Sequence, residues 1–469
     1  MSVPQLVEAD STELWASLIA DQADFPDERL NTRYGLILQT LANRPQDSFP
    51  QACQTNKEAK GLYRFVENKR LKVDDFLQPL VDTTLEACRG VKTILAIQDS
   101  SSANYASLLH TKGLGKLNDS AALGLHFHTT IAVQTDGVVR GLFHQSHWSR
   151  PPEAQTDADQ PKHKPIQDKE SYKWLEGIEA AEAAVDNLPA EQRPRLLHIF
   201  DREGDIHEVL QRISASEHGA IIRVAQKNRA VAGPLGCVAA AIAAAPCLGV
   251  KTIQVPAQHD RSKRKAKLEL RARAVTLAPD QKKYPHRQAV VWTLVEAKES
   301  AAPAGVEPLH WLLWTTEPAD SLAQIEEILR LYKLRWLIED FHLTLKSGCR
   351  IEELRLETAD RLIKAILMYS AVALRIVALR DLARQSPDSP CTVVLTTDQW
   401  QVLYSYIHDQ PATAATKVPT IRQAVLWIGR LGGHLNRKGD GMPGVRVLWR
   451  GWRDLTVLLA GYRAGRAGQ

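Results

Sequence analysis

Short apolar segments recur along the first two thirds of the chain, and the first of them, 92–98, is rich in β-branched residues. The segment 92–98 ends at Asp99, and the segment 195–200 ends at Asp201. Runs of this length and composition are typical of buried strands. Further strands are predicted at 220–224 and 310–314, and a hairpin at 126–134 and 138–148 around the turn 135–137.

Most of the remaining segments carry apolar residues at a helical period. Helices are predicted over residues 1 to about 70, 171–185, 205–213, 322–346 and 359–384, and in the tail from 397 onward, which is broken at Gly432-Gly433 and by a loop at 436–444. Residues 225–308 depart from this succession of strands and helices. They contain an alanine-rich stretch and then, at 267–275, alternating polar and apolar residues. We expect a small β-rich insertion there, with a basic loop at Arg261–Lys265.

The order of these elements indicates the fold class. A strand with an acid, a hairpin, a helix, a second strand with an acid and a late helix with a carboxylate follow one another as in a ribonuclease H-like fold. In that α/β fold the first two strand ends lie side by side, and the late helix crosses them. We expect the catalytic domain at 76–355, including the insertion at 225–308, with helical domains at 1–75 and 356–469.

Composition narrows the class of protein. The 469 residues are 44% hydrophobic and 24% charged, with a formal net charge of +5, which indicates a folded chain of several domains that tolerates nucleic acid as a partner. The six cysteines are scattered and the N-terminus lacks a signal peptide, so a reducing cytoplasm is expected. Two apolar stretches, at 230–250 and 366–374, are interpreted as parts of a soluble protein without a membrane span.

Four residues of the late helix share one face. Tyr332, Arg335, Glu339 and Lys346 lie at offsets of 0, 3, 7 and 14, which places them within an arc of roughly 60° at 100° per residue. This composition is not that of a core stripe. It suits phosphate binding around a carboxylate, or an exposed face with an i, i+4 salt bridge between Arg335 and Glu339.

Three acids are candidates for one metal site. Asp99, Asp201 and Glu339 would meet if the fold is as expected, although a single acid at a strand end more often caps a turn. Mg²⁺ and Mn²⁺ prefer oxygen ligands, and two such ions held about 4 Å apart bind the attacking and leaving oxygens of a phosphodiester. There is no glycine-rich phosphate loop, so a nucleotide cofactor is not expected.

Two other groups of polar residues have alternative interpretations. In the N-terminal segment, Arg29 and Arg33 share one helix face and Lys57, Lys60 and Arg64 another; these are solvated surfaces or phosphate contacts. His126, His128, His144 and His147 lie on the two strands of the hairpin. They suggest zinc only weakly, because no pattern completes a ligand set, and packing or DNA contact is favoured.

Several motifs in order along the chain resemble those of one family. The Tyr332, Arg335, Glu339 and Lys346 spacing resembles the signature of bacterial insertion-sequence transposases of the IS-four group, in the DDE class. Further stretches resemble its Tn-five-like members, namely GLYRF at 61–65, LAIQDS at 95–100, FDREGDI at 200–206, WLLWTTEP at 311–318 and RLGG at 430–433.

The resemblance implies roles for individual residues. Asp99, Asp201 and Glu339 match the metal-binding catalytic triad. The residues implied to contact transposon-end DNA are Tyr332, Arg335 and Lys346 of the signature, Arg223 and Trp311 near the cleaved strand, and, more loosely, Arg29, Arg33, Lys57 and Arg64 of the end-recognition domain. Trp311 is implied to stack on a flipped base, with a core tryptophan as the alternative. The C-terminal helices match a dimerisation region.

The implied activity is cut-and-paste transposition in the bacterial cytoplasm, on nucleoid DNA. A homodimer would bind two terminal inverted repeats, cleave with Mg²⁺ or Mn²⁺, through a hairpin intermediate in Tn-five-like relatives, and join the 3′-hydroxyl ends to target DNA. Two alternatives stay open, a metal-dependent nuclease that does not join DNA and a domesticated DNA-binding protein without catalysis.

Overall fold

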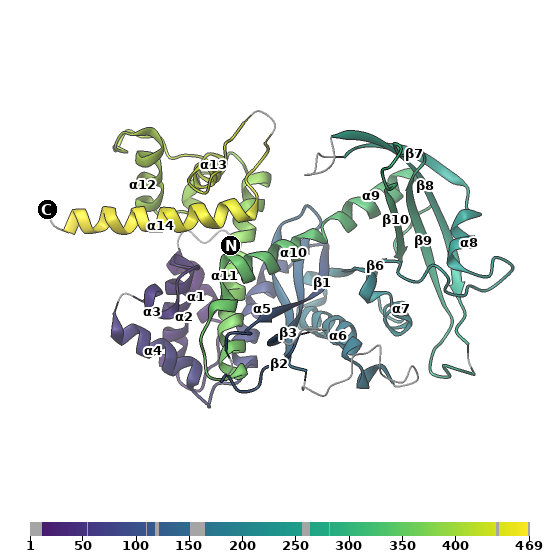
Figure 1. Ribbon diagram of the computed structural model, residues 1–469, viewed down its shortest axis with the longest axis horizontal. Helices are drawn as coiled ribbons and strands as arrows, with labels where there is room; N and C mark the ends of the chain where they lie inside the picture. The colour runs from purple at the N-terminus through teal and green to yellow at the C-terminus, as the bar shows by residue number, and fades with distance from the viewer. Residues whose placement is uncertain are drawn as a thin grey trace.

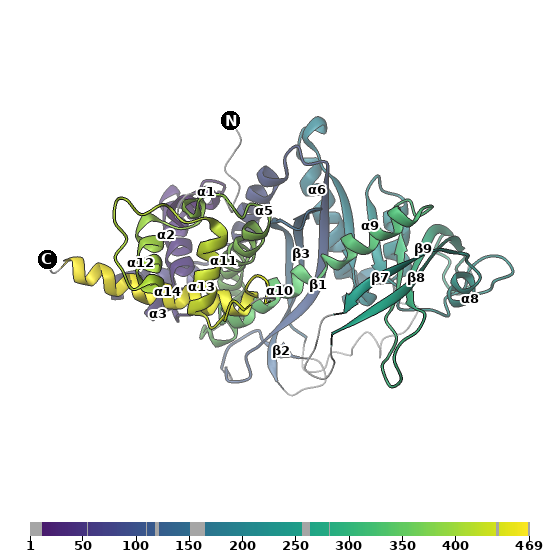
Figure 2. The same ribbon diagram turned by 90° about the horizontal axis from the view of Figure 1, so that it is seen from above.

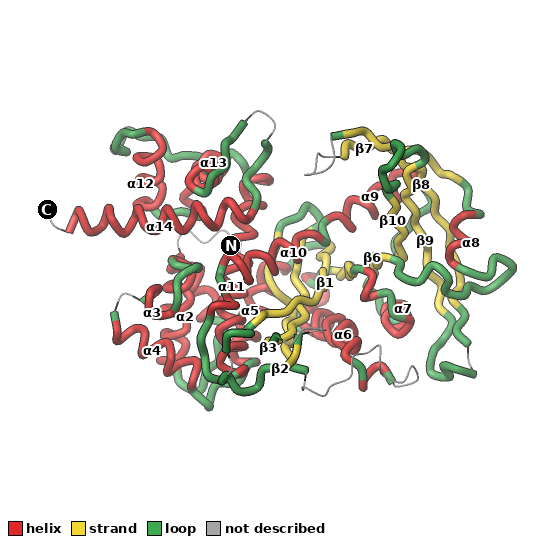
Figure 3. The backbone as a smooth tube through the Cα atoms, viewed as in Figure 1, coloured by secondary structure: helices red, strands yellow, loops and turns green. Residues whose placement is uncertain are grey.

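The structure is a computed structural model that describes residues 12–53, 55–108, 110–117, 122–150, 165–255, 263–280, 282–437 and 440–467. Figure 1 shows the helices of the two chain ends gathered on one side and a long sheet on the other. Colouring by secondary structure separates a helical half from a strand-rich half (Figure 3). The first two residues of the expected basic loop, 261 and 262, lie outside the described residues.

The described part of the chain forms one mixed sheet of ten strands in the order β2-β3-β1-β5-β6-β10-β9-β8-β7, with β4 paired to β3. The strands are β1 Thr93–Asn104, β2 Gly115–Lys116, β3 Leu123–Gln134, β4 Val139–Trp148, β5 Arg195–Phe200, β6 Gly219–Arg223, β7 Cys247–Val255, β8 Arg264–Leu277, β9 Val290–Glu299 and β10 His310–Thr315. β3 and β4 form the expected hairpin, and β1, β5 and β6 are parallel. This is the arrangement of a ribonuclease H-like core.

The insertion does not form a separate small unit. β10 pairs antiparallel with both β6 and β9, and β8 and β7 follow, so the insertion lengthens the central sheet. The short helix α8 (Val238–Ala243) lies within it. This pairing could not be predicted from the sequence, because it joins residues that are far apart along the chain.

Helices cover both faces of the sheet. One face packs against α9 (Leu322–Lys333), α10 (Trp336–Leu343) and α11 (Ala359–Gln385) in a large hydrophobic cluster. The other face packs against α5 (Asp74–Cys88), α6 (Lys173–Asp186), α7 (His207–Ser214) and α8. Figure 2 shows α9 and α10 running between the insertion strands and the helical half.

The N-terminal helices are α1 (Thr12–Ala20), α2 (Glu28–Asn43), α3 (Phe49–Ala52) and α4 (Asn56–Glu67). Phe25, Tyr34, Phe65 and Phe76 form their buried aromatic centre, with ring centroids 5.3–6.2 Å apart. A capping box in which Thr55 and Glu58 bond each other's backbone starts α4. The domain is therefore a packed helical unit, as expected.

The C-terminal helices are α12 (Thr397–His408), α13 (Ile421–Leu431) and α14 (Val445–Ala467). They pack around their own apolar cluster, which includes the end of α11. The segment 359–384 is long and apolar enough to cross a membrane, but 89% of its most apolar window is buried inside the protein. The helix predicted at 359–384 is present, and 366–374 lies buried within it.

Two sequence-based expectations about elements near the site are wrong. β1 does not end at Asp99 but continues to Asn104, because its antiparallel pairing with β3 continues after its pairing with β5 stops. The helix expected at 322–346 is broken between α9 and α10, where Arg335 N bonds Tyr332 O and Ile338 N bonds Arg335 O, both across three residues. A π-helical turn, Thr344–Gly348, then follows α10.

Candidate active site

The strand register brings Asp99, Asp201 and Arg223 together. Ile97 of β1 lies opposite Ile199 of β5, and Ile199 lies opposite Ile221 of β6. Asp99, Asp201 and Arg223 each follow one of these isoleucines by two residues. Because side chains alternate along a strand, they lie on the same face of the sheet as the isoleucines. This face is the one covered by α9 and α10.

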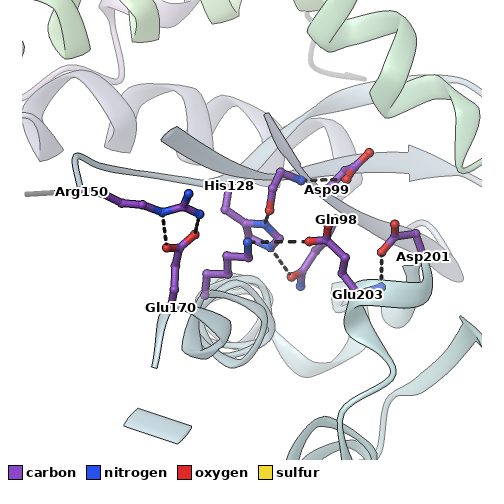
Figure 4. Close-up of polar contacts among 9 residues, drawn as sticks. Gln98, Asp99, His128, Arg150, Glu170, Asp201 and Glu203 are labelled. Atoms are coloured by element: carbon purple, nitrogen blue, oxygen red, sulfur yellow. Dashed lines mark hydrogen bonds and ion pairs between the residues drawn. The ribbon is translucent and has the colours of Figure 1, made fainter. Parts of the chain in front are cut away.

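The two aspartates influence each other electrostatically. Burial, and then the charge of Asp201, raise the pKa of Asp99 to about 7. The backbone N–H of Ser100 donates to Asp99 Oδ1 at 2.8 Å. Asp201 caps the one-turn helix Arg202–Gly204 and accepts a hydrogen bond from the backbone N–H of Glu203 at 2.8 Å (Figure 4). Each carboxylate therefore has one oxygen fixed by the backbone.

Glu339 reaches this pair through an arginine. Arg335 forms an ion pair with Glu339, and its Nη1 lies 3.5 Å from Asp99 Oδ2. Asp340, the next residue, instead pairs with Arg380 of α11. Among the described residues no three acidic, histidine or cysteine side chains lie close enough together to hold a metal ion. The third carboxylate is adjacent to the site but turned to Arg335.

The signature residues do not form one exposed face. Tyr332 is buried, with 5% exposure, and its ring meets Trp311 edge-on at a centroid distance of 6.4 Å. Burial raises the pKa of its hydroxyl group. The alternative of one exposed face is therefore wrong for Tyr332, whose ring packs against Trp311 of β10. Trp311 is half-buried, with Lys333 Nζ 5.6 Å from its ring.

Lys346 lies in the π-helical turn. Its Nζ is 3.5 Å from Glu352 Oε1, and Cys349 N closes the wide turn on Thr344 O at 2.7 Å. Single π-turns occur frequently at functional sites, where they redirect a side chain. Lys346 therefore does not follow the simple helical spacing from Glu339 on which its position was predicted.

The N-terminal basic residues are exposed on α2 and α4. Arg29 pairs with Asp27 at 2.6 Å, with 90% of its side chain exposed. Arg33 lies against α4, since a Cβ added at Gly61 would stand 2.2 Å from Arg33 Nη1. Lys57 and Arg64 are exposed on α4. The four basic residues therefore lie on two adjoining helices, separate in sequence from the three carboxylates.

The hairpin histidines are packing residues rather than a zinc site. His126 stacks on Trp148, His128 meets Trp174 edge-on, and His147 lies against Phe127. Burial lowers the pKa of His144 to about 4 and of His147 to about 3. They are neutral at neutral pH, and in the described residues they make no ligand cluster.

Sequence reasoning missed one residue beside the site. Trp336, the first residue of α10, is 61% exposed, and the guanidinium carbon of Arg335 lies 5.4 Å from its ring. An exposed tryptophan beside these carboxylates presents a large apolar ring that a bound partner can contact. Its position between Arg335 and Glu339 in sequence was the available signal.

Comparison with known families agrees with this arrangement. Residues 12–71 match a family described as transposase DNA-binding, residues 180–375 match the transposase DDE domain, and residues 371–468 match the transposase Tn5 dimerisation domain. Asp201 and Glu339 lie within the DDE match, and the exposed basic residues of α2 and α4 lie within the DNA-binding match.

Fold, site and matches together define a DDE transposase, a metal-dependent polynucleotidyl transferase that uses divalent ions. Within that class the chain belongs to the IS4-family, Tn5-like transposases, which confirms the resemblance inferred from its motifs. Its N-terminal helices are a DNA-binding domain, and its C-terminal helices form dimers.

Proposed function

We propose that this transposase binds the terminal inverted repeats of a mobile element, cleaves both ends and joins the 3′-hydroxyl groups to target DNA. The observation that carries the proposal is the alignment of Asp99 and Asp201 at one position of neighbouring parallel strands, with Glu339 linked to them through Arg335. We assign residues 1–75 to end binding, 76–355 to catalysis and 356–469 to dimerisation.

Asp99, Asp201 and Glu339 would hold two Mg²⁺ ions, for which Mn²⁺ would substitute. The donor set fits, because all three are oxygen ligands and the raised pKa of Asp99 marks a place where a nearby positive charge is favoured. When bound, the ions would activate the attacking oxygen and stabilise the leaving oxygen of the phosphodiester.

The surrounding residues of the chain would position DNA. Arg223 and Lys346 would neutralise phosphate oxygens on either side of the carboxylates. Arg335 would release Glu339 and then also bind a phosphate oxygen. Tyr332 contacts the Trp311 ring edge-on, and Trp311 would stack the face of its ring on an unstacked base. Trp336 would contact the DNA at the cleavage point, which accounts for its exposure.

End recognition belongs to α2 and α4. Arg29, Arg33, Lys57 and Arg64 would contact phosphates there, so binding should weaken steeply with salt concentration. The 3′-hydroxyl released by the first cut would attack the opposite strand to give a hairpin, as in Tn-five-like relatives. No nucleotide is needed as an energy source, and we place the activity in the bacterial cytoplasm, on nucleoid DNA.

The dimer surface would include the outer side of α14. Val457 is 66% exposed, Tyr406 of α12 is 56% exposed, and both line a groove with Leu431 and Leu458. Exposed apolar side chains around a groove on a dimerisation domain mark a contact with a second copy. Each copy would bind one DNA end and bring it to the other.

The proposal is tested with Glu339→Gln. Purified protein is incubated with a labelled duplex carrying the inverted repeat, a supercoiled target and Mg²⁺, with EDTA as the metal-free arm. We expect the wild type to give joined products and Glu339→Gln to lose them by at least about 100-fold with end binding intact. Glu327→Gln, in an exposed ion pair with Arg330 on α9, is the matched control and should retain activity.

Other outcomes identify the alternatives. Mg²⁺-dependent cleavage without joined products would indicate a nuclease. End binding with no cleavage by the wild type at any Mg²⁺ or Mn²⁺ concentration would indicate a DNA-binding protein without catalysis. A gel assay for the closed hairpin end tests that intermediate separately.

A further inference from the structure

His128 lies directly behind the strand that carries Asp99. It belongs to β3, is fully buried, and is placed opposite Ser100 in the pairing of β3 with β1. Its Nδ1 is 2.9 Å from Ser100 Oγ, and its Nε2 is 3.0 Å from Gln98 Oε1. One imidazole therefore holds the residues on both sides of Asp99 (Figure 4).

The hydrogen-bond directions in this group follow from its chemistry. Burial holds the pKa of His128 well below its ordinary value, so the ring is neutral and carries one proton. Gln98 Oε1 can only accept, so the proton lies on Nε2. Nδ1 is then the acceptor, and the hydroxyl of Ser100 donates to it. Both ring nitrogens are used.

The surroundings leave this group little freedom. Trp174 of α6 meets the His128 ring edge-on at 4.6 Å between centroids. Gly177 of α6 lies so close that an added Cβ would stand 2.6 Å from Gln98 Oε1 and 2.9 Å from Thr130 Oγ1. Both contacts come from α6, so this helix packs closely against the group.

The group is connected to the Asp99 carboxylate by one further hydrogen bond. Side chains alternate along β1, so Gln98 and Ser100 point toward α6 while Asp99 points toward α10. The backbone N–H of Ser100 donates to Asp99 Oδ1 at 2.8 Å, which leaves Oδ2 toward Arg335. Fixing the Ser100 side chain from behind fixes this N–H.

We propose that His128 is a positioning residue that sets the orientation of the Asp99 carboxylate through Ser100, with Gln98 as the second anchor. The inference rests on the proposed function, in which Asp99 is a metal ligand. Residues that orient a metal ligand from behind commonly change metal affinity by about 10–100-fold when they are replaced.

Two substitutions test the two hydrogen bonds of the imidazole separately. The Oδ1 atom of His128→Asn can occupy the place of Nδ1 and keep the bond to Ser100, whereas the amide of His128→Gln can reach Gln98 but not Ser100. The measurement is Mn²⁺ binding to the DNA-free full-length protein by calorimetry. We expect His128→Gln to bind Mn²⁺ about 10–100-fold more weakly and His128→Asn to stay within about threefold of wild type.

Ser100→Ala tests the same bond from its other end by removing one oxygen atom. It should weaken Mn²⁺ binding as His128→Gln does, and the double variant should be no weaker than either single one, because both remove one interaction. If His128→Gln does not fold, Ser100→Ala still tests the role of the hydrogen bond between His128 and Ser100. His147→Gln is the matched control, since it replaces a half-buried histidine of the same hairpin that contacts Phe127.

Wild-type Mn²⁺ affinity in both His128→Gln and Ser100→Ala would overturn the inference. Equal losses in His128→Asn and His128→Gln would overturn the role of Ser100 and leave His128 a packing residue. Asp99→Asn distinguishes the two levels of the proposal. If it binds Mn²⁺ as tightly as wild type, the metal site itself is misassigned; if it loses binding while the His128 variants do not, only the positioning role fails.

Discussion

The guanidinium of Arg335 forms an ion pair with the carboxylate of Glu339, one helical turn away. The same guanidinium reaches Asp99, with Nη1 3.5 Å from Oδ2. A single cation thus bridges two of the three carboxylates assigned to metal binding. Because Glu339 cannot give the same oxygens to Arg335 and to a metal ion, the two cations compete for it.

Replacement of Arg335 by Gln should therefore strengthen metal binding in the absence of DNA. Removing the competing cation should tighten Mn²⁺ binding by about tenfold, equivalent to ~1.4 kcal/mol. Cleavage of the DNA end should nevertheless fall, because Arg335 is also assigned to the phosphates. Calorimetry with Mn²⁺ and a cleavage assay measure the two effects. Weaker Mn²⁺ binding by Arg335→Gln would show that the arginine holds the carboxylates in place for the metal.

Asp99 should make the metal-free protein less stable as the pH rises. Its pKa is raised from 3.8 to about 7 in the folded protein by burial and by Asp201. Between these values the folded state keeps a proton that the unfolded state has lost, so stability falls as the pH rises through this window and stays reduced above pH 7. Asp99→Asn removes this effect.

We expect Asp99→Asn to be more stable than wild type at pH 8 by about 2 kcal/mol, a value reduced for the partial exposure of the group. Near pH 4 the two proteins should have similar free energies of unfolding. Urea denaturation in EDTA at both pH values measures this difference. A variant that is less stable than wild type at pH 8 would contradict the raised pKa.

The sequence allowed the carboxylate positions to be predicted because local signals determine them. Asp99 and Asp201 each follow a short apolar run of the length typical of a buried strand, and the parallel pairing of those strands then aligns the acids. The ion pair between Arg335 and Glu339 was foreseen as an i, i+4 contact. These features depend on spacing along a single element.

The features that could not be predicted depend on distant partners. Tyr332 is buried because Trp311 of β10 lies beside it, and β1 continues past Asp99 because β3 pairs with it. The insertion extends the sheet because β9 pairs with β10. The redirection of Lys346 by a π-turn also has no signal in a pattern of regular helical spacing.

Asp205, a buried acid in the stretch 200–206 at the end of β5, should be essential for stability. Asp205, 2% exposed, pairs with Arg229 at 2.7 Å and accepts hydrogen bonds from Trp314 Nε1 and from the backbone N–H groups of Ala225 and Gln226. It thus ties the loop after Asp201 to the ends of β6 and β10.

Asp205→Asn should lower the free energy of unfolding by about 3–5 kcal/mol, because it leaves the Arg229 charge buried without its partner. The matched control is Glu327→Gln, which breaks an exposed ion pair and should cost less than about 1 kcal/mol. Denaturant titration of both variants checks the prediction. Equal, small losses would show that the Asp205 cluster is not a structural centre.

Dimerisation should depend on the exposed side of α14. Val457 is 66% exposed within the region that matches the Tn5 dimerisation domain. Val457→Glu would place a charge in the proposed interface, where it would lose its hydration on dimer formation, so the dissociation constant should rise by about tenfold or more. Val291→Glu is a matched control, because Val291 is 67% exposed but lies on β9 of the insertion. Sedimentation analysis of both variants with paired DNA ends measures the shift, and an equal effect of the two substitutions would place the interface elsewhere.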